Sequence, residues 1–280
     1  MTTRTADTLG GVQKTLLLPL WGRAVETGRS APLLVDVAAA QMIEKLGYDF
    51  STIAANIHPI TRLAWIARAT HVDRTVVAFL ARRPRATIVN LGCGLDTTFE
   101  RVDNGQLTWI DLDLPDVIEL REGLVGPSPR RRAFACSVLD PRWLDELEVD
   151  EDVMLVAAGV LYYLEEHDVR ALLARLATAL PGAELVFDVS SPRGARIANK
   201  RVIEDSGMDP SAILRWGIER PQDLVSWARR IEVLETYRLF RGFGTGLPWK
   251  ARLGMWLSDV LAIMSMVHLR FVPALPEADT

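Results

Sequence analysis

Two kinds of hydrophobic pattern alternate along most of this chain. Short runs rich in β-branched residues are typical of buried strands, whereas apolar residues that recur every three or four positions indicate helices. We expect strands at Thr87 to Leu91, Leu107 to Asp111, Ala133 to Cys136, Val153 to Ala157, Glu184 to Asp188, Ile231 to Phe240 and Ile263 to Pro273. Because strands alternate with helical segments, the pattern predicts an α/β fold with a parallel, doubly wound sheet.

The same periodicity predicts the helices. The clearest one lies between the fourth and fifth strands, with apolar positions at Val169, Leu172, Leu173, Leu176 and Leu180. Two earlier helices are expected at 33–46, ended by Gly47, and at 61–81. Their predicted buried residues are Leu34, Val37, Ala38, Met42 and Ile43 in the first helix and Leu63, Ala64, Ala67, Val76, Val77 and Leu80 in the second. A further helix is expected at 248–261, whereas 190–228 has little periodicity and predicts loop and short helix.

Composition narrows the class of protein. The 280 residues are 49% hydrophobic and carry a formal net charge of -4, which is enough apolar material for one substantial core. Mild acidity argues against binding to nucleic acid. The dense basic run Arg130 to Arg132 is interpreted as a solvated loop that leads into the third strand.

The cysteines, the histidines and the first apolar run indicate the cellular compartment of the protein and whether a metal site is expected. Cys93 and Cys136 cannot form a disulfide framework, and we interpret them as reduced thiols of a cytoplasmic protein. The run from Leu16 to Leu20 is broken by Pro19 and is too short for a signal sequence or a membrane span. Histidine and cysteine do not cluster at the spacing of metal ligands, so no metal is predicted.

A glycine turn is the strongest chemical signal. The first strand ends in Gly92-Cys93-Gly94, and polar residues then open a helix, as in turns that let a backbone approach a nucleotide-like ligand. A third glycine, which dinucleotide binding requires, is replaced by Thr97, and the carboxylate of Asp96 would repel a phosphate. An adenosine cofactor with a cationic end and no phosphate fits better, and S-adenosylmethionine is such a molecule.

Several stretches together resemble a known family. They are "KTLLLPLWGRA", "TIVNLGCGLDTTFERVDNGQLTWIDLDLPDVIELR", "SVLDPRWLDEL" and "VAAGVLYYLEEHDVRALL". They are similar to the TcmP-like O-methyltransferases of the leucine carboxyl methyltransferase family, which are class I S-adenosylmethionine enzymes. The resemblance extends from about Lys14 to the "MVHLRF" near the end of the chain.

The resemblance implies a particular organisation. It implies a Rossmann-like, seven-stranded, mostly parallel sheet whose last strand lies antiparallel beside the fifth, with an N-terminal helical cap. We therefore expect a single methyltransferase domain over 1–280. Within it we expect a helical cap with its leading segment at 1–81, a cofactor-binding core at 82–189, a substrate-side insertion at 190–228 and C-terminal strands and helix at 229–280.

The resemblance also implies the cofactor site. Arg68 matches an arginine that holds the methionyl carboxylate, and a bidentate pair between arginine and carboxylate suits that end of the cofactor. Lys14 matches a residue near the same carboxylate, although an exposed lysine before an apolar anchor is the alternative. The candidate cofactor-binding residues are Lys14, Arg68, Asn90, Gly92, Cys93, Gly94, Asp96, Thr97, Asp111, Asp113, Val138, Leu139, Asp140, Ala158 and Gly159.

Two of these positions have competing interpretations. Strand-end geometry favours Asp111 as the acceptor of ribose hydrogen bonds, whereas the resemblance points to Asp113; we favour Asp113 and place Asp111 second. Leu139 and Asp140 match residues around the adenine, but Asp140 can equally cap a helix before Pro141. Ala158 stands where family members commonly carry a glutamate, so no role of that glutamate is carried over.

Methyl transfer from a sulfonium is an in-line displacement that depends chiefly on positioning. A carboxylate acceptor is already ionised at neutral pH, whereas a phenol, with a pKa of about 10, benefits from a base. The candidates at the reaction site are Tyr162, Tyr163, His58 and, with less support, His167. Tyr162 or Tyr163 as a wall of the methyl site is preferred.

Three functional hypotheses follow. The first is an S-adenosylmethionine-dependent O-methyltransferase that acts on a carboxyl or phenolic oxygen of a small aromatic, polyketide-like natural product. The second changes the acceptor to a protein C-terminal carboxylate. The third is a protein of this fold that binds the cofactor without methyl transfer, as a cyclase, a decarboxylase or a regulatory binder. The expected partner is a small molecule, with no nucleic acid and no membrane, and the chain is expected to be a monomer or a homodimer.

Overall fold

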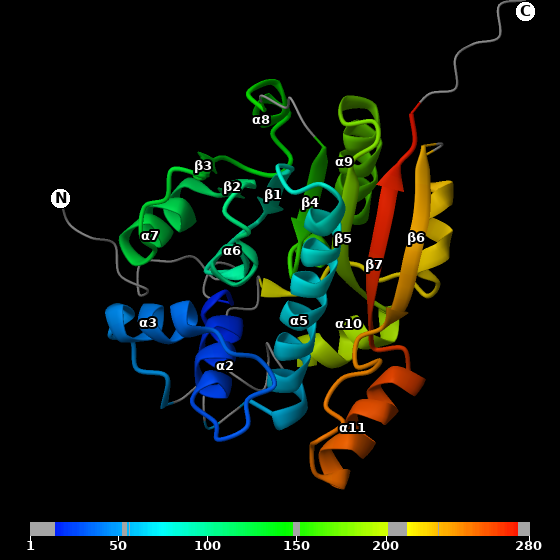
Figure 1. Ribbon diagram of the computed structural model, residues 1–280. Helices are drawn as coiled ribbons and strands as arrows, with labels where there is room; N and C mark the ends of the chain where they lie inside the picture. The colour runs from blue at the N-terminus through cyan, green and yellow to red at the C-terminus, as the bar shows by residue number, and fades with distance from the viewer. Residues whose placement is uncertain are drawn as a thin grey trace, which may run out of the picture.

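The centre of the structure is a seven-stranded sheet (Figure 1). The computed structural model describes residues 15–51, 55, 57–147, 152–200, 212–228 and 230–273. The strands are β1 (Thr87–Leu91), β2 (Thr108–Asp113), β3 (Arg131–Ala135), β4 (Val153–Ala157), β5 (Glu184–Ser190), β6 (Ile231–Arg238) and β7 (Met264–Phe271). Their order across the sheet is β3-β2-β1-β4-β5-β7-β6.

Strand directions confirm the predicted topology. β3, β2, β1, β4 and β5 are parallel to their neighbours, and the crossover from β3 to β4 reverses the direction in which the sheet grows. β7 lies antiparallel between β5 and β6, with Glu184 opposite Arg270 and Ser190 opposite Met264. In such a sheet, ligands bind at the carboxyl ends of the strands next to the reversal, here β1 and β4.

Strand ends differ from the sequence prediction in two places that matter. β2 continues to Asp113, two residues beyond the predicted end, so Asp113 stands at its tip. β3 begins at Arg131, and the interpretation of Arg130 to Arg132 as a loop is therefore wrong in part. β3 is a half-exposed edge strand, where arginines can pair with acids on α6: Arg131 pairs with Glu100.

Helices cover both faces of the sheet. The α-helices are α2 (Leu17–Thr27), α3 (Val37–Leu46), α5 (Pro59–Arg82), α6 (Thr98–Val102), α7 (Pro115–Leu124), α8 (Arg142–Asp145), α9 (Glu166–Ala179), α10 (Pro192–Ala198) and α11 (Trp249–Val260). One core cluster joins α5 and α6 to the sheet through residues such as Phe79 and Trp109. The other joins α8 and α9 to the opposite face, with Trp143 and Leu176 among its members.

The predicted buried sides of two helices need correction. Val37 is 58% exposed and Val77 is 51% exposed. α3 begins only at Val37, because the side chain of Asp36 accepts a hydrogen bond from the backbone N–H of Ala39 and caps the helix there. This cap directs Ala39 and Met42 into the core and leaves Val37 on the outside.

The described residues of the loosely patterned region 190–228 contain α10 and a short 3-10 helix, Pro221–Ser226, as the expectation of loop and short helix predicts for them. The rest of that region, 201–211, lies outside the described residues. α10 and α11 lie together at the lower end of the view in Figure 1, below the sheet. No helix in the described part of the chain combines the length and apolarity that crossing a bilayer requires.

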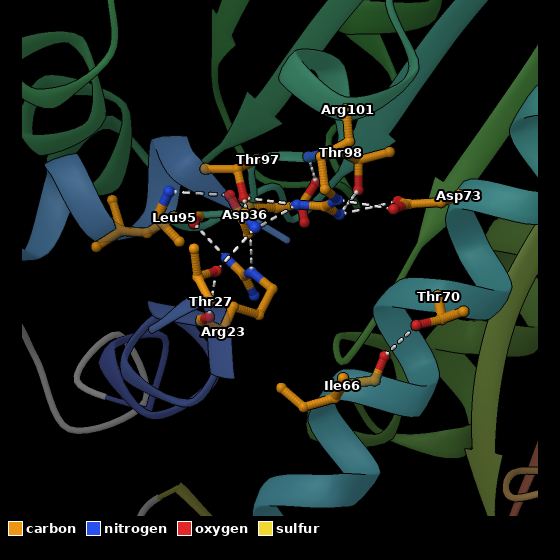
Figure 2. Close-up of polar contacts among 12 residues, drawn as sticks. Arg23, Thr27, Asp36, Ile66, Thr70, Asp73, Leu95, Thr97, Thr98 and Arg101 are labelled. Atoms are coloured by element: carbon orange, nitrogen blue, oxygen red, sulfur yellow. Dashed lines mark hydrogen bonds and ion pairs between the residues drawn. The ribbon is translucent and has the colours of Figure 1, made fainter. Parts of the chain in front are cut away.

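A buried ionic cluster fastens the helical N-terminal region to the rest of the molecule. Asp36, which caps α3, accepts hydrogen bonds through Oδ2 from Arg23 of α2 at 2.8 Å, Arg101 of α6 at 2.7 Å and Thr97 at 2.5 Å (Figure 2). Arg101 also forms a two-point ion pair with Asp73 of α5. The Asp36 carboxylate therefore ties α3 to α2 and α6, and Arg101 extends the cluster to α5.

Candidate active site

Three connected cavities lie at the carboxyl ends of β1, β2, β4 and β5. The turn cavity, about 120 Å³, is bordered by the glycine turn, Arg68 and Gly159. The β2 cavity, about 200 Å³, is bordered by Asp113, Val138 and the same glycine turn. The apolar cavity, about 360 Å³, extends from Arg68 towards α11. Tyr163 lines all three cavities, which makes it their common wall.

The glycine turn allows a ligand to approach its backbone closely. Gly92 and Gly94 have φ of +61° and +49°, a region that side chains disfavour. A Cβ on Gly92 would lie 2.6 Å from the side chain of Val160, so the turn packs directly against the loop after β4. The backbone N–H of Cys93 donates to the carbonyl of Leu112 at 3.0 Å, which fixes the turn against β2.

Asp113 and Asp111 occupy different environments. Asp113 lines the β2 cavity and accepts hydrogen bonds from the backbone N–H groups of Gly94 and Leu114, both at 2.7 Å. Burial raises the pKa of Asp113, although these hydrogen bonds oppose the shift. Asp111 lines none of the three cavities; it is buried in an ion pair with Arg121 at 2.8 Å. Of the two candidates, the structure brings only Asp113 to a cavity.

Only one of three predicted polar residues around the glycine turn lines a cavity. Asp96 lines the turn cavity, and its carboxylate accepts hydrogen bonds from Asn90 at 3.2 Å and from the backbone N–H of Thr98 at 3.0 Å. Burial opposes its ionisation, but Arg101 and Arg23 hold the pKa of Asp96 below its ordinary value. Asn90 and Thr97, both predicted cofactor contacts, line none of the three cavities.

Arg68 of α5 lies where the turn cavity meets the apolar cavity. Its Nη1 donates to the hydroxyl of Tyr162 at 2.9 Å and to the carboxylate of Asp188 at 3.1 Å. In the described part of the chain both of its hydrogen bonds leave through Nη1, so Nε and Nη2 retain N–H groups that a ligand can engage. Burial opposes the charge of Arg68, but Tyr162 and Asp188 raise its pKa above the ordinary value, so it stays a cation.

Gly159 makes room for this arrangement. It has φ of +80°, and a Cβ there would lie 2.5 Å from Nη1 of Arg68. Its backbone N–H donates to Oδ1 of Asp188 at 2.6 Å. Asp188 therefore connects the loop after β4 to Arg68 from a fully buried position at the end of β5. Ala158 precedes Gly159 and also lines the turn cavity.

The two tyrosines form the wall between the turn cavity and the apolar cavity. Their ring centroids are 4.9 Å apart in an edge-to-face arrangement. Burial raises the pKa of Tyr163, and burial together with Asp188 raises the pKa of Tyr162 well above its ordinary value. Both phenols are neutral near pH 7, which suits a wall or a hydrogen-bond donor and excludes a phenolate base.

Several predicted residues lie elsewhere. Leu139 packs against the core, and Asp140, which is half-buried, pairs with the exposed Arg142 and accepts its backbone N–H. The alternative interpretation of Asp140 as a helix cap is wrong, because α8 has Pro141 as its N-cap residue and no side-chain cap. His167 is 81% exposed. Lys14 lies outside the described residues.

Two remaining candidates do lie at a cavity. His58 borders the apolar cavity, but its Nδ1 accepts the backbone N–H of Ile60 and so caps α5. Cys93 lines the turn cavity, and burial raises its pKa well above the ordinary value, so it is a neutral thiol.

Sequence reasoning missed Asp188, the carboxylate that pairs with Arg68. The sequence did contain a signal for Asp188: it is an acidic residue at the end of the predicted fifth strand, just as Asp113 follows the predicted second strand. Trp65 lines both the turn cavity and the apolar cavity, but the sequence alone could not separate it from the other seven tryptophans of the chain. Nothing in its helical position distinguishes it from a core tryptophan. Among the residues with described coordinates, no three histidine, cysteine, aspartate or glutamate side chains gather as a metal site would require.

The glycine turn, the acid at the tip of β2 and the strand order together invite comparison with known proteins. The family model described as leucine carboxyl methyltransferase matches residues 17–177. This chain belongs to that family. The match covers the region from α2 through most of α9, and therefore nearly every element that borders the turn cavity.

Relatives of known name extend the comparison. The tetracenomycin polyketide synthesis O-methyltransferase TcmP of Streptomyces glaucescens is 34% identical over 220 residues, which are 78% of this chain and 79% of that protein. The S-adenosyl-L-methionine-dependent methyltransferase dpfgK of Gibberella zeae is 28% identical over 276 residues, 90% of this chain and 92% of that one.

The chain is also similar to solved structures. The N-methyltransferase NodS from Bradyrhizobium japonicum WM9, in complex with S-adenosyl-L-homocysteine, is 16% identical and gives a TM-score of 0.48 over 84% of this chain and 98% of its own. Magnesium protoporphyrin IX methyltransferase from Synechocystis PCC 6803 gives 0.49 at 11% identity over 84% and 99%.

The protein is thus an S-adenosylmethionine-dependent methyltransferase. Its residues fit this cofactor: the turn cavity offers a close backbone approach at Gly92, the cationic edge of Arg68 for a carboxylate and the carboxylate of Asp96 for an ammonium group. Asp113 borders the adjoining β2 cavity, where it can accept hydrogen bonds from a ribose diol.

Proposed function

We propose that this enzyme transfers a methyl group to a carboxyl oxygen of a small aromatic, polyketide-like molecule in the cytoplasm. The observation that carries the proposal is the apolar cavity, which adjoins the turn cavity at Trp65, Arg68, Tyr162 and Tyr163. Its volume of about 360 Å³ lies in the range of small-molecule sites. The name of TcmP, an O-methyltransferase of polyketide synthesis, supports the same class of acceptor.

The cofactor would lie across the turn and β2 cavities. Asp113 would hold its ribose, the backbone of the glycine turn would support its middle, and the Nε and Nη2 groups of Arg68 would hold its carboxylate. When bound, it supplies a sulfonium methyl group. Tyr162 and Tyr163 would then flank the path between the two substrates and keep bulk water from it, so that most of the rate comes from alignment.

The groups that face the apolar cavity favour a carboxylate over a phenol. Tyr162 and Tyr163 are neutral, and Asp188 is already engaged by Arg68 and Gly159. The Nδ1 of His58 accepts a hydrogen bond, which in the neutral ring leaves the proton on Nε2 and no lone pair for a substrate. The described residues that line this cavity therefore provide no free base, and an already ionised acceptor does not need one.

A panel assay tests the proposal. Purified protein is incubated with S-adenosylmethionine and matched pairs of polycyclic aromatic carboxylic acids and phenols, and products are identified by mass. We expect methyl esters, which alkali hydrolyses, from the acids. Alkali-stable methyl ethers from the phenols, with no ester, would refute the choice of oxygen. Methylation of a peptide with a C-terminal leucine, in preference to all aromatic acids, would refute the small-molecule acceptor.

A further inference from the structure

Helix α11 carries an unusual outer surface. Six large apolar side chains on the helix and at its end are between 36% and 68% exposed. They are Trp249, Leu253, Trp256, Leu257, Val260 and Leu261, named together here as the α11 stripe. Only Met255 of this helix is buried. A surface of this kind usually marks an interaction site.

The stripe follows helical spacing. Trp249, Leu253, Trp256 and Val260 recur three or four positions apart, so they share one side of the helix. The opposite side packs on the protein: a Cβ on Gly254 would lie 2.8 Å from the side chain of Ile60 on α5. The orientation of α11 is therefore set by tight packing, and that packing turns the stripe outward.

The stripe is continuous with the apolar cavity. Leu257 and Leu261 belong to both, and Gly254 and Ser258 of the same helix also line the cavity. α11 lies at the lower edge of the view in Figure 1, and residues of α10 and α11 both line the apolar cavity. Whatever covers the stripe therefore lies beside the cavity that we assign to the acceptor.

We propose that a second copy of this chain covers the stripe, in a dimer with two antiparallel α11 helices at its centre. At about 150 to 250 Å² for a large aromatic side chain, and somewhat less for the others, the exposed fractions leave roughly 600 Å² of side-chain surface per copy. Complete coverage would bury up to roughly 1,200 Å² in total, against the roughly 1,000 Å² of a specific interface. A two-fold axis needs a patch that matches itself, and a single straight stripe does so.

Charges at the border of the stripe suit the antiparallel direction. Arg252 and Asp259 lie on the same flank of the helix, and Arg252 has no ion-pair partner within the described residues. In an antiparallel pair, Arg252 of one copy would come opposite Asp259 of the other, whose Oδ1 also accepts the backbone N–H of Phe240 at 3.1 Å within its own chain. In a parallel pair the two-fold axis would carry this flank of the second copy to the other side of the contact, so Arg252 could not meet Asp259 of the other copy.

Light scattering after size-exclusion chromatography tests the dimer without any substrate. We expect the full chain at twice its 31.1 kDa mass, and Trp256→Glu at the mass of one chain. Val77→Glu is the matched control, because Val77 is 51% exposed on α5, away from the stripe, and this variant should remain dimeric. Leu253→Glu provides a second disruption if Trp256→Glu does not fold, as judged by circular dichroism and binding of S-adenosylhomocysteine.

A monomeric wild-type chain at all concentrations would overturn the proposal, and so would dimers that persist in both α11 variants. A monomer that binds anionic phospholipid vesicles through the stripe would also overturn it, in favour of a membrane surface.

A second readout concerns the acceptor and rests on the proposed function. If the second copy closes the cavity, Trp256→Glu should raise the KM for the acceptor severalfold and leave the affinity for S-adenosylhomocysteine unchanged. An unaltered KM in a variant shown to be monomeric would remove the link to the cavity and leave the dimer standing. Failure to find any acceptor would count against the proposed function alone.

Discussion

Replacing Arg68 by lysine tests which group its Nε and Nη2 bind. Lysine keeps a positive charge near Asp188, which is fully buried and would otherwise lose its counter-charge. It cannot present two parallel N–H groups as Nε and Nη2 do. The substitution therefore removes a bidentate contact while retaining the condition for folding.

The size of the effect follows from the geometry. A hydrogen bond to a charged group contributes about 1.5 to 3 kcal/mol. Loss of one such bond to a ligand carboxylate corresponds to roughly 10- to 100-fold weaker binding. We expect that loss for S-adenosylhomocysteine and less than about a twofold change for 5′-methylthioadenosine, which has the same adenosine and sulfur but lacks the carboxylate.

Calorimetric titration of both ligands provides the measurement. Arg82→Lys is the control, because Arg82 lies on the same helix in a half-exposed ion pair with Glu184 and should affect neither ligand. Equal weakening of both ligands would show a general disturbance of the site and refute the assignment. Unchanged binding of S-adenosylhomocysteine with a raised KM for the acceptor would show that Arg68 binds the acceptor instead.

Three further predictions concern binding, stability and pH. Asp113→Asn should weaken S-adenosylhomocysteine and 5′-methylthioadenosine alike, by roughly tenfold for a lost hydrogen bond to a charged group; selective loss of one ligand would contradict a ribose contact. Asp36→Asn removes the negative charge beside the buried Arg23 and Arg101, and it should lower the free energy of unfolding by about 3 to 5 kcal/mol. Urea titrations measure this change, and a value below about 1 kcal/mol would contradict the anchoring role of Asp36. Burial opposes ionisation of Glu184, but His268 and Arg270 lower its pKa to about 2, against an ordinary value of 4.5. Because the folded-state pKa is depressed, the stabilising contribution of ionised Glu184 is complete above about pH 4.5 and is lost as pH falls towards 2. The free energies of unfolding of wild type and Glu184→Gln should therefore converge over that pH range. A constant difference between them would refute the linkage.

The sequence correctly predicted the strands and turns that depend on a few neighbouring residues. The strand at Thr87–Leu91 and the turn after it were placed correctly, because β-branched residues and closely spaced glycines act over a few positions. The seven strands and the antiparallel position of the last one were also confirmed, the latter through the resemblance.

The hydrophobic pattern could not predict contacts between residues that are far apart in the sequence. Arg68 and Asp188 are 120 positions apart, and only the folded sheet brings the carboxyl end of β5 beside α5. The choice between Asp111 and Asp113 depended on where β2 ends, and a shift of two residues decided which carboxylate meets a cavity. Thr97 was predicted to touch the cofactor, but a carboxylate 61 positions earlier engages its hydroxyl.

The ionic cluster around Asp36 has a consequence for how ligands exchange. Because Asp36 joins α2 and α3 to α6, swinging the helical region away from the glycine turn would separate buried charges from their partners. That makes such a hinge motion slow. Thr15 and Leu16 border both the turn and β2 cavities just before α2 begins, so we expect ligands to enter and leave past these two residues. Ligand exchange then requires no separation of the buried charges around Asp36.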